Sequence, residues 1–266
     1  MTRPPTGRTA LAACAFWFAL ALFGSSPAAA QACSKAITVG TGHWEPYAYY
    51  DSQNRFTGID ADMARAIFKE AGCTLVELGT KPAVRNMALF EKGEIDLMTG
   101  ASLTRERLRF AWFSAPYRAE TVGLFALADE ATRYREVRSF PDFLGRPLTL
   151  LAPRVGWYGA AYDKHLGALR DSGRLSQFLD YAQGIRMLAA GRAHLMLGDA
   201  AGIEHAAARQ GVKVQPLPFW LVEAQVHLMF SRATVTPADV HRIDAAIVRL
   251  QKRGALEAIR HSYGGK

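Results

Sequence analysis

The carboxylate of Asp199 stands at a position where many α/β proteins bind ligands. Asp199 follows the strand-like segment 194–197, in which Leu195, Met196 and Leu197 are apolar, and precedes the helix-like segment 200–210. It therefore comes at the carboxyl end of a strand, where open α/β sheets place their ligands. An anion there could hold the ammonium group of a solute, or it could simply cap the following helix.

Motifs that would identify a familiar class of enzyme are missing from the sequence. It contains no Gly-x-Ser-x-Gly nucleophile elbow, no P-loop and no Gly-x-Gly-x-x-Gly dinucleotide motif. Its seven histidines have no close metal-ligand spacing. We therefore expect neither a metal nor another cofactor, and no catalytic residue.

An alternation of strands and helices must position any binding site. Strand-like segments lie at 36–40, 74–78, 95–99, 148–152, 193–197 and 227–231. Helix-like segments lie at 60–71, 82–92, 160–172, 183–190, 200–210, 236–251 and 256–263. Asp60 is the expected N-cap of the first helix and Gly72 its end, while 118–128 is extended and 133–145 is rich in polar and turn residues. This order predicts an α/β fold with parallel sheets flanked by helices.

A short internal echo suggests two similarly built halves. Segment 93–100 (GEIDLMTG) matches segment 191–198 (GRAHLMLG) at four spaced positions. Each combines a helix end, a glycine turn and a buried strand, as expected for two lobes that aim at one cleft.

Residues 1–30 have the features of a secretory signal peptide. Arg3 and Arg8 precede an apolar run over 9–23, and Ala28 and Ala30 form a small-residue cleavage site. The run is shorter than the roughly 20 apolar residues that span a bilayer, although a membrane anchor is the alternative. We expect export to the periplasm, with a lipid-modified Cys33 as a second alternative that its flanking residues do not favour.

The mature chain keeps two cysteines in an oxidising compartment. Cys33 precedes the strand-like segment 36–40 and Cys73 precedes 74–78. If those strands are parallel neighbours, both sulfurs lie at the same edge of the sheet, where a disulfide is possible. Two cysteines alone would not complete a tetrahedral zinc site.

Charge and length restrict the possible partners. The full chain has 32 basic and 24 acidic residues; without Arg3 and Arg8 the balance is 30 against 24, a net charge of +6. These residues are scattered, which indicates a solvated surface and no nucleic-acid partner. About 235 mature residues suffice for two lobes of roughly 110.

Four stretches carry a resemblance to a known family. They are 56–63 (FTGIDADM), 93–97 (GEIDL), 102–107 (SLTRER) with 113–117 (FSAPY), and 230–231 with the terminal helices. Over nearly all of 34–264 the sequence resembles the family-3 extracellular solute-binding proteins, which serve polar amino-acid ABC transporters. The third stretch is the most specific of the four.

The resemblance implies two α/β lobes, each with a mostly parallel sheet flanked by helices. Lobe 1 would comprise 34–119 and 227–266, and lobe 2 would comprise 120–226. Two segments, near 118–124 and 219–227, would cross between the lobes. Such proteins close around their ligand by hinge bending.

The resemblance also assigns ligand-binding roles to individual residues. Arg107 would grip the carboxylate of an amino acid with two parallel hydrogen bonds, unless it forms only a surface salt bridge with Glu106 or another nearby acid. Ser102 would add a donor or cap a helix. Asp199 would hold the ammonium group.

The side chain of the ligand would meet aromatic residues. Trp44 would stack on it, unless it is ordinary core, and Tyr158 lies in the glycine turn 156–159 of the second lobe. Trp157 and Tyr158 depart from the small polar residues usual in that turn. Thr41 departs from the acid that several cationic amino-acid binders carry.

These expectations describe a monomeric periplasmic receptor that hands a small amino-acid-like solute to the permease of an ABC transporter. Two alternatives remain open on the same fold. One is a cyclohexadienyl dehydratase-like enzyme with Asp199 or Glu45 as its acid. The other is a ligand-sensing domain that reports to a signalling partner.

Overall fold

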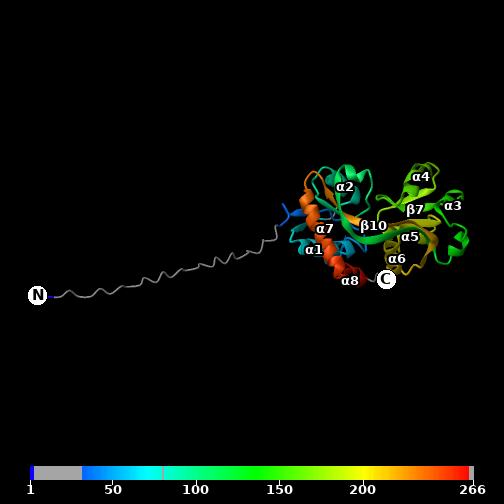
Figure 1. Ribbon diagram of the computed structural model, residues 1–266. Coiled ribbons are helices and arrows are strands. Elements are labelled where there is room, and N and C mark those ends of the chain that lie inside the picture. Colours follow the sequence, from blue (N-terminus) through cyan, green and yellow to red (C-terminus); the bar gives the residue numbers. More distant parts are fainter. Residues whose placement is uncertain (3–31, 80, 264–266) are drawn as a thin grey trace. The chain divides into compact units, whose positions relative to one another are not determined.

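A computed structural model describes residues 1–2, 32–79 and 81–263 (Figure 1). The residues from Ala32 onward form one compact unit. The expected signal peptide falls almost entirely on residues 3–31, which lie outside the described residues.

One sheet of eight strands runs through this unit in the order β4-β1-β5-β10-β6-β9-β7-β8. The strands are β1 (Ile37–Val39), β4 (Leu75–Glu77), β5 (Leu97–Ala101), β6 (Ala111–Leu127), β7 (Leu150–Pro153), β8 (Leu175–Phe178), β9 (Leu195–Asp199) and β10 (Val214–Ser231). Pairing is parallel within β4-β1-β5 and within β9-β7-β8, and antiparallel where β6 and β10 take part. A separate hairpin joins β2 (Tyr49–Tyr50) to β3 (Phe56–Thr57).

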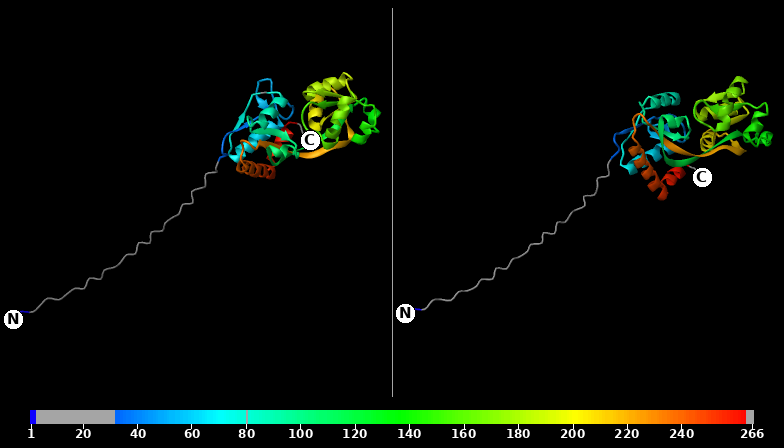
Figure 2. Two further views of the ribbon diagram at one scale, coloured as in Figure 1. Left: turned by 90° about the horizontal axis from the view of Figure 1, so that it is seen from above. Right: turned by 45° about the horizontal axis from the view of Figure 1, so that its top comes forward.

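Helices cover the two ends of this sheet as two separate lobes (Figures 1 and 2). The first lobe carries α1 (Ile59–Ala71), α2 (Ala83–Glu91), α7 (Pro237–Lys252) and α8 (Ala255–Ser262). The second carries α3 (Phe140–Leu144), α4 (Ala160–Asp171), α5 (Tyr181–Ala189) and α6 (Ala200–Arg209). Each lobe has its own buried apolar clusters, built around residues such as Phe68 and Phe90 in the first and Phe143 and Phe178 in the second. The predicted two-lobed α/β fold is therefore confirmed.

The long strands β6 and β10 connect the lobes, as expected for the two crossing segments. They pair antiparallel from Val214 and Leu127 to Ser231 and Ala111, with register shifts near Trp220 and His227. Gly123 lies where a side chain would collide with the ring of Trp220. Such irregularities bend a strand locally, which suits a ribbon that passes from one lobe to the other.

The internal echo corresponds to equivalent structures in the two lobes. Gly93 and Gly191 follow α2 and α5, and both have positive φ angles, 74° and 67°. Each glycine turn leads into a central strand of its lobe, β5 or β9. The two strands end beside β10 and β6, so both point toward the crossing ribbon.

Two local predictions were wrong, and one strand was missed. Asp60 does not cap α1, whose N-cap is Gly58; instead its carboxylate pairs with Arg118 from β6. The segment 133–145 is more than polar turns, because Phe140 and Phe143 are buried and form the short helix α3. Strand β8 was not predicted, since its residues show only partial burial.

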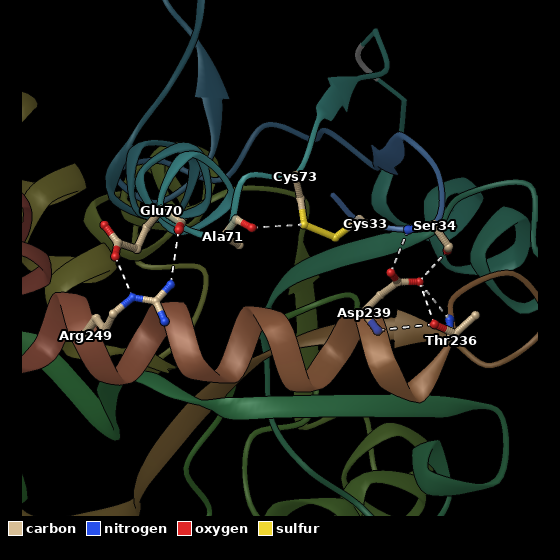
Figure 3. Close-up of a disulfide and its surroundings, with 8 residues drawn as sticks. All are labelled: Cys33, Ser34, Glu70, Ala71, Cys73, Thr236, Asp239 and Arg249. Carbon is tan, nitrogen blue, oxygen red and sulfur yellow. Dashed lines mark hydrogen bonds and ion pairs between the residues drawn. A yellow bond between two sulfur atoms is a disulfide. The ribbon is translucent and has the colours of Figure 1, made fainter. Parts of the chain in front are cut away.

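A disulfide joins Cys33 to Cys73, as predicted, with 5.1 Å between the Cα atoms (Figure 3). The parallel pairing of β1 with β4, in which Ile37 lies opposite Leu75, brings the two cysteines together. Next to it, Asp239 accepts hydrogen bonds from the backbone and hydroxyl of Ser34 at 2.8 and 2.6 Å. The N-terminal strand is thus tied to both α1 and α7.

Candidate ligand-binding site between the lobes

Asp199 lies at the carboxyl end of β9, where it begins α6. Its Oδ1 caps that helix by accepting a hydrogen bond from the Gly202 N–H at 2.9 Å. The same oxygen accepts a hydrogen bond from the hydroxyl of Tyr47, which belongs to the other lobe. Asp199 is only 6% exposed, and within the described part of the chain Oδ2 has no hydrogen-bond partner. Both readings of this residue, helix cap and binding group, fit the geometry.

Tyr181, at the start of α5, forms a hydrogen bond with the backbone of Asp199. Its hydroxyl accepts a hydrogen bond from the Asp199 N–H at 2.9 Å. The ring packs directly against Gly198 and Gly202, where any larger residue would collide with it. Trp44 from the first lobe lies against this ring, with 4.6 Å between the ring centroids. Trp44 is half-buried and contacts the apolar clusters of both lobes.

Arg107 belongs to a single 3-10 turn, Arg107–Arg109, that precedes β6. One guanidinium nitrogen, Nη1, donates to the carbonyl oxygen of Ser102 at 2.9 Å. Burial lowers the pKa of Arg107, while the charges of Glu106 and Glu120 oppose that shift. The structure shows no ion pair between Arg107 and Glu106, which lies 3.9 Å from Arg109 instead. The other guanidinium N–H groups of Arg107 have no partner among the described residues.

Ser102 does not cap a helix; it contacts an acid that the sequence analysis did not single out. Its hydroxyl donates to Oε1 of Glu120 at 3.1 Å. Glu120 lies on the crossing strand β6, and burial raises its pKa. Arg118 opposes the rise, whereas the charges of Asp199 and Asp60 add to it. No sequence motif marks Glu120, because its environment is created by both lobes.

Tyr158 is a buried residue whose phenol is influenced by the charges of several predicted site residues. It is 8% exposed, and its hydroxyl donates to the Val155 carbonyl at 3.1 Å. Burial raises its pKa, the charges of Glu120 and Asp199 raise it further, and Arg107 lowers it. Arg107 and Asp199 do not contact each other, but both act electrostatically on this one phenol.

A second network supports Tyr47 from the first lobe. Arg118 donates from Nε and Nη2 to the two carboxylate oxygens of Asp60 at 2.6 and 3.0 Å. The guanidinium carbon of Arg118 lies 4.1 Å from the centre of the Tyr47 ring. Gly100 passes close by, where a Cβ atom would come within 2.8 Å of the Asp60 carboxylate. No local sequence pattern predicts this network, because the position of Asp60 at the start of a helix favours a cap instead.

Glu45 lies at the edge of the same interface. Its carboxylate is 3.9 Å from both His205 Nε2 and Arg209 Nη1 of α6. Burial lowers the pKa of His205, whereas Glu45 raises it. A cavity of about 20 Å³ beside Glu45 is lined also by Asp180 and Tyr181. Thr41, in contrast, is fully buried and donates to the Leu78 carbonyl, which is a structural role.

Other features of the described chain do not offer a stronger site. A larger hollow of about 440 Å³ lies on the second lobe, away from every predicted residue, and is lined by Ala128, Glu204, Ala207, Ala208, Val212, Lys213 and Val214. Within residues 32–79 and 81–263, no three His, Cys, Asp or Glu side chains gather as metal ligands. None of the described helices is both long and apolar enough to cross a membrane.

Known proteins share both the sequence pattern and the fold. Over 97 residues the chain is 32% identical to cyclohexadienyl dehydratase of Pseudomonas aeruginosa, a match that covers 36% of this chain and only 35% of that enzyme. A histidine kinase sensor domain with similarity to periplasmic binding proteins has a TM-score of 0.70 and 20% identity, covering 86% of this chain and 96% of its own. The arginine-, lysine-, histidine-binding protein ArtJ from Geobacillus stearothermophilus has a TM-score of 0.67 and 19% identity, with coverages of 87% and 96%.

The family comparison covers far more of the chain than the match to the dehydratase. Residues 37–266 match the family described as bacterial extracellular solute-binding proteins, family 3. That range includes both lobes, both crossing strands and every residue of the candidate site. The chain therefore belongs to the family-3 bacterial extracellular solute-binding proteins.

Proposed function

We propose that this protein is a periplasmic receptor that binds an amino acid or a similar small zwitterion between its lobes and delivers it to an ABC transporter permease. In this proposal Arg107 holds the ligand carboxylate and Asp199 holds the ammonium group. Ser102 and Tyr158 line the site, and Trp44 contacts the ligand side chain. The receptor acts as a monomer without a cofactor.

The observation that carries the proposal is the arrangement of opposite charges around Tyr158. A guanidinium from the first lobe and a carboxylate from the second both influence this buried phenol. A zwitterion has the complementary pair of charges. Because Arg107 has free N–H groups and Asp199 has a free oxygen, each can form charge-assisted hydrogen bonds with the ligand.

Closure would strengthen these bonds. Hydrogen bonds to charged groups gain strength as water is excluded and the local dielectric falls. The hydroxyl of Tyr47 already occupies Oδ1 of Asp199. The ligand ammonium would therefore approach Oδ2 or replace Tyr47 while the lobes are open. An affinity of about 1 μM, roughly −8 kcal/mol, would suit a receptor that must also release its ligand.

Calorimetry on two arginine variants tests the proposal. A thermal-shift screen of amino acids, polyamines and small organic acids first identifies the solute that stabilises the protein most. Arg107→Ala is expected to weaken its binding by about 2 kcal/mol or more, because the ligand carboxylate is left buried without a partner. Arg105→Ala is the matched control, since Arg105 is exposed in the same segment. Unchanged affinity in Arg107→Ala would remove Arg107 from the site.

Delivery to a transporter needs its own test, because a sensing domain would bind ligand in the same way. Cells that lack the gene are expected to lose high-affinity uptake of the radiolabelled solute. Uptake that persists, together with loss of a transcriptional response to the solute, would favour the sensing function.

A cyclohexadienyl dehydratase-like activity is the second candidate, and two observations favour it. One is the partial match to the Pseudomonas aeruginosa enzyme. The other is Glu120, because burial raises the pKa of its carboxyl group, and a raised pKa is a feature of carboxyl groups that act as general acids. Glu120 has a stronger structural case for this role than Glu45, which lies 3.9 Å from the cation of Arg209 at the edge of the interface. Formation of aromatic product from prephenate or arogenate would replace the receptor proposal with the enzymatic one.

A further inference from the structure

We propose that Glu120 is a second acidic ligand-binding group, and that together with Asp199 it selects amino acids whose side chain carries a positive charge. The inference rests on the proposed receptor function and specifies its substrate class.

The strand register brings Glu120 close to Asp199. On β6, Val122 lies directly opposite Asp199 of β9. Side chains two residues apart on a strand point to the same face, so Glu120 and Val122 share the face that Asp199 occupies. Glu120 is thus a diagonal neighbour of Asp199, at a distance that long side chains and a small ligand can bridge. The hydroxyl of Ser102 fixes the Glu120 carboxyl from the first lobe.

The cations near Glu120 are already engaged or too distant to pair with it. Arg118 is held by both carboxylate oxygens of Asp60. Arg107 donates to the Ser102 carbonyl and forms no ion pair with Glu120 in the described structure. The other charged neighbours are Asp199 and Asp60, which both disfavour a negative charge on Glu120. Asp60 is already paired with Arg118, whereas Asp199 forms no ion pair in the described structure.

The charge balance leaves Glu120 without a partner when a neutral amino acid binds. The ligand carboxylate would pair with Arg107 and its ammonium with Asp199. An ionised carboxylate that closure removes from water is costly unless a cation or several donors compensate it. A ligand with a second positive group supplies that cation. A ligand with an uncharged side chain does not.

Arginine and citrulline provide the sharpest comparison, because they share size and shape and differ in the charge of the terminal group. Wild-type protein is expected to bind arginine at least about 10-fold more tightly than citrulline in calorimetry, the order expected for a charge-assisted hydrogen bond. Glu120→Gln is expected to reduce this ratio to less than about 3-fold without weakening citrulline. Glu223→Gln is the matched control, because Glu223 is exposed on the adjacent crossing strand β10.

A measurement on the wild-type protein keeps the proposal falsifiable even if Glu120→Gln does not fold. Burial raises the pKa of Glu120, so this carboxyl takes up a proton at a higher pH than an ordinary glutamate does. Binding of both ligands is therefore measured over a pH series that starts at about pH 7.5 and becomes more acidic. The arginine to citrulline ratio should fall on acidification. A general loss of contacts to the ammonium group, which both ligands share, would weaken both together and leave the ratio unchanged.

The possible outcomes separate this inference from the receptor proposal. Citrulline and other neutral amino acids that bind as tightly as arginine would overturn the inference and leave the receptor function standing. A preference for arginine that survives both Glu120→Gln and acidification would also overturn it. If no amino acid of any class binds to folded protein, the receptor function itself fails, and the inference fails with it.

Discussion

Asp60 and Arg118 form an ion pair whose side chains are only 3% and 6% exposed. Two hydrogen bonds connect them, and Arg118 in turn lies over the ring of Tyr47. Tyr47 donates to Asp199, so a chain of contacts runs from the core of the first lobe to the proposed ammonium site of the second. Buried ionic groups of this kind fix geometry, because each is satisfied in only one arrangement.

Replacing Asp60 with Asn should therefore destabilise the protein strongly. The change leaves the Arg118 guanidinium buried without its counter-ion, which typically costs about 3–5 kcal/mol. Glu130→Gln is the control, because Glu130 pairs with Arg133 at the surface and such pairs contribute about 1 kcal/mol or less. Urea unfolding followed by circular dichroism measures both. A loss in Asp60→Asn no larger than that of the control would show that the pair does not stabilise the fold.

At the level of secondary structure, local signals predicted most elements but not the residues that depend on distant partners. Periodic apolar residues and the glycine at position 72 located α1 to within one residue. Strand β10 is far longer than the predicted segment 227–231, because its first half carries prolines and exposed residues that hide a strand pattern. The sequence does not predict the roles of Glu120 and Tyr47 in the site, for a different reason. Tyr47 and its partner Asp199 are 152 residues apart, so no local pattern reveals their contact.

The disulfide is the element-scale feature with the clearest energetic consequence. Cys33 and Cys73 close a loop with a sequence separation of 40 residues, and a bridge of that length stabilises a protein by about 2–4 kcal/mol. The double variant with serine at both positions should lose that amount in urea unfolding. Reducing agent should destabilise the wild-type protein similarly and leave the double variant unchanged. Two free thiols in denatured, unreduced mature protein would contradict the prediction.

At the scale of the whole molecule, the described structure brings the two lobes into contact at several points. Trp44 packs on Tyr181, Tyr47 donates to Asp199, and Glu45 lies near His205. The first two contacts involve residues that are proposed to meet the ligand. The contacts that join the lobes and the proposed contacts with the ligand therefore involve the same side chains. A ligand must compete with the contacts that Trp44 and Asp199 make across the interface without it.

Tyr47→Phe should shift the ligand-free protein toward open conformations. The substitution keeps the ring beside Arg118 but removes the hydroxyl that bridges to Asp199. A hydrogen bond to a charged group is worth about 1.5–3 kcal/mol, so the ratio of open to closed molecules should rise about 10-fold or more. Small-angle X-ray scattering should show a larger radius of gyration for the variant without ligand and the wild-type value with saturating ligand, because hinge closure is then driven by the ligand.

Tyr162→Phe is the control, since that hydroxyl, whose pKa burial raises to about 12, has no hydrogen-bond partner in the described structure. Identical radii for Tyr47→Phe and wild type in the absence of ligand would mean that this contact does not hold the lobes together.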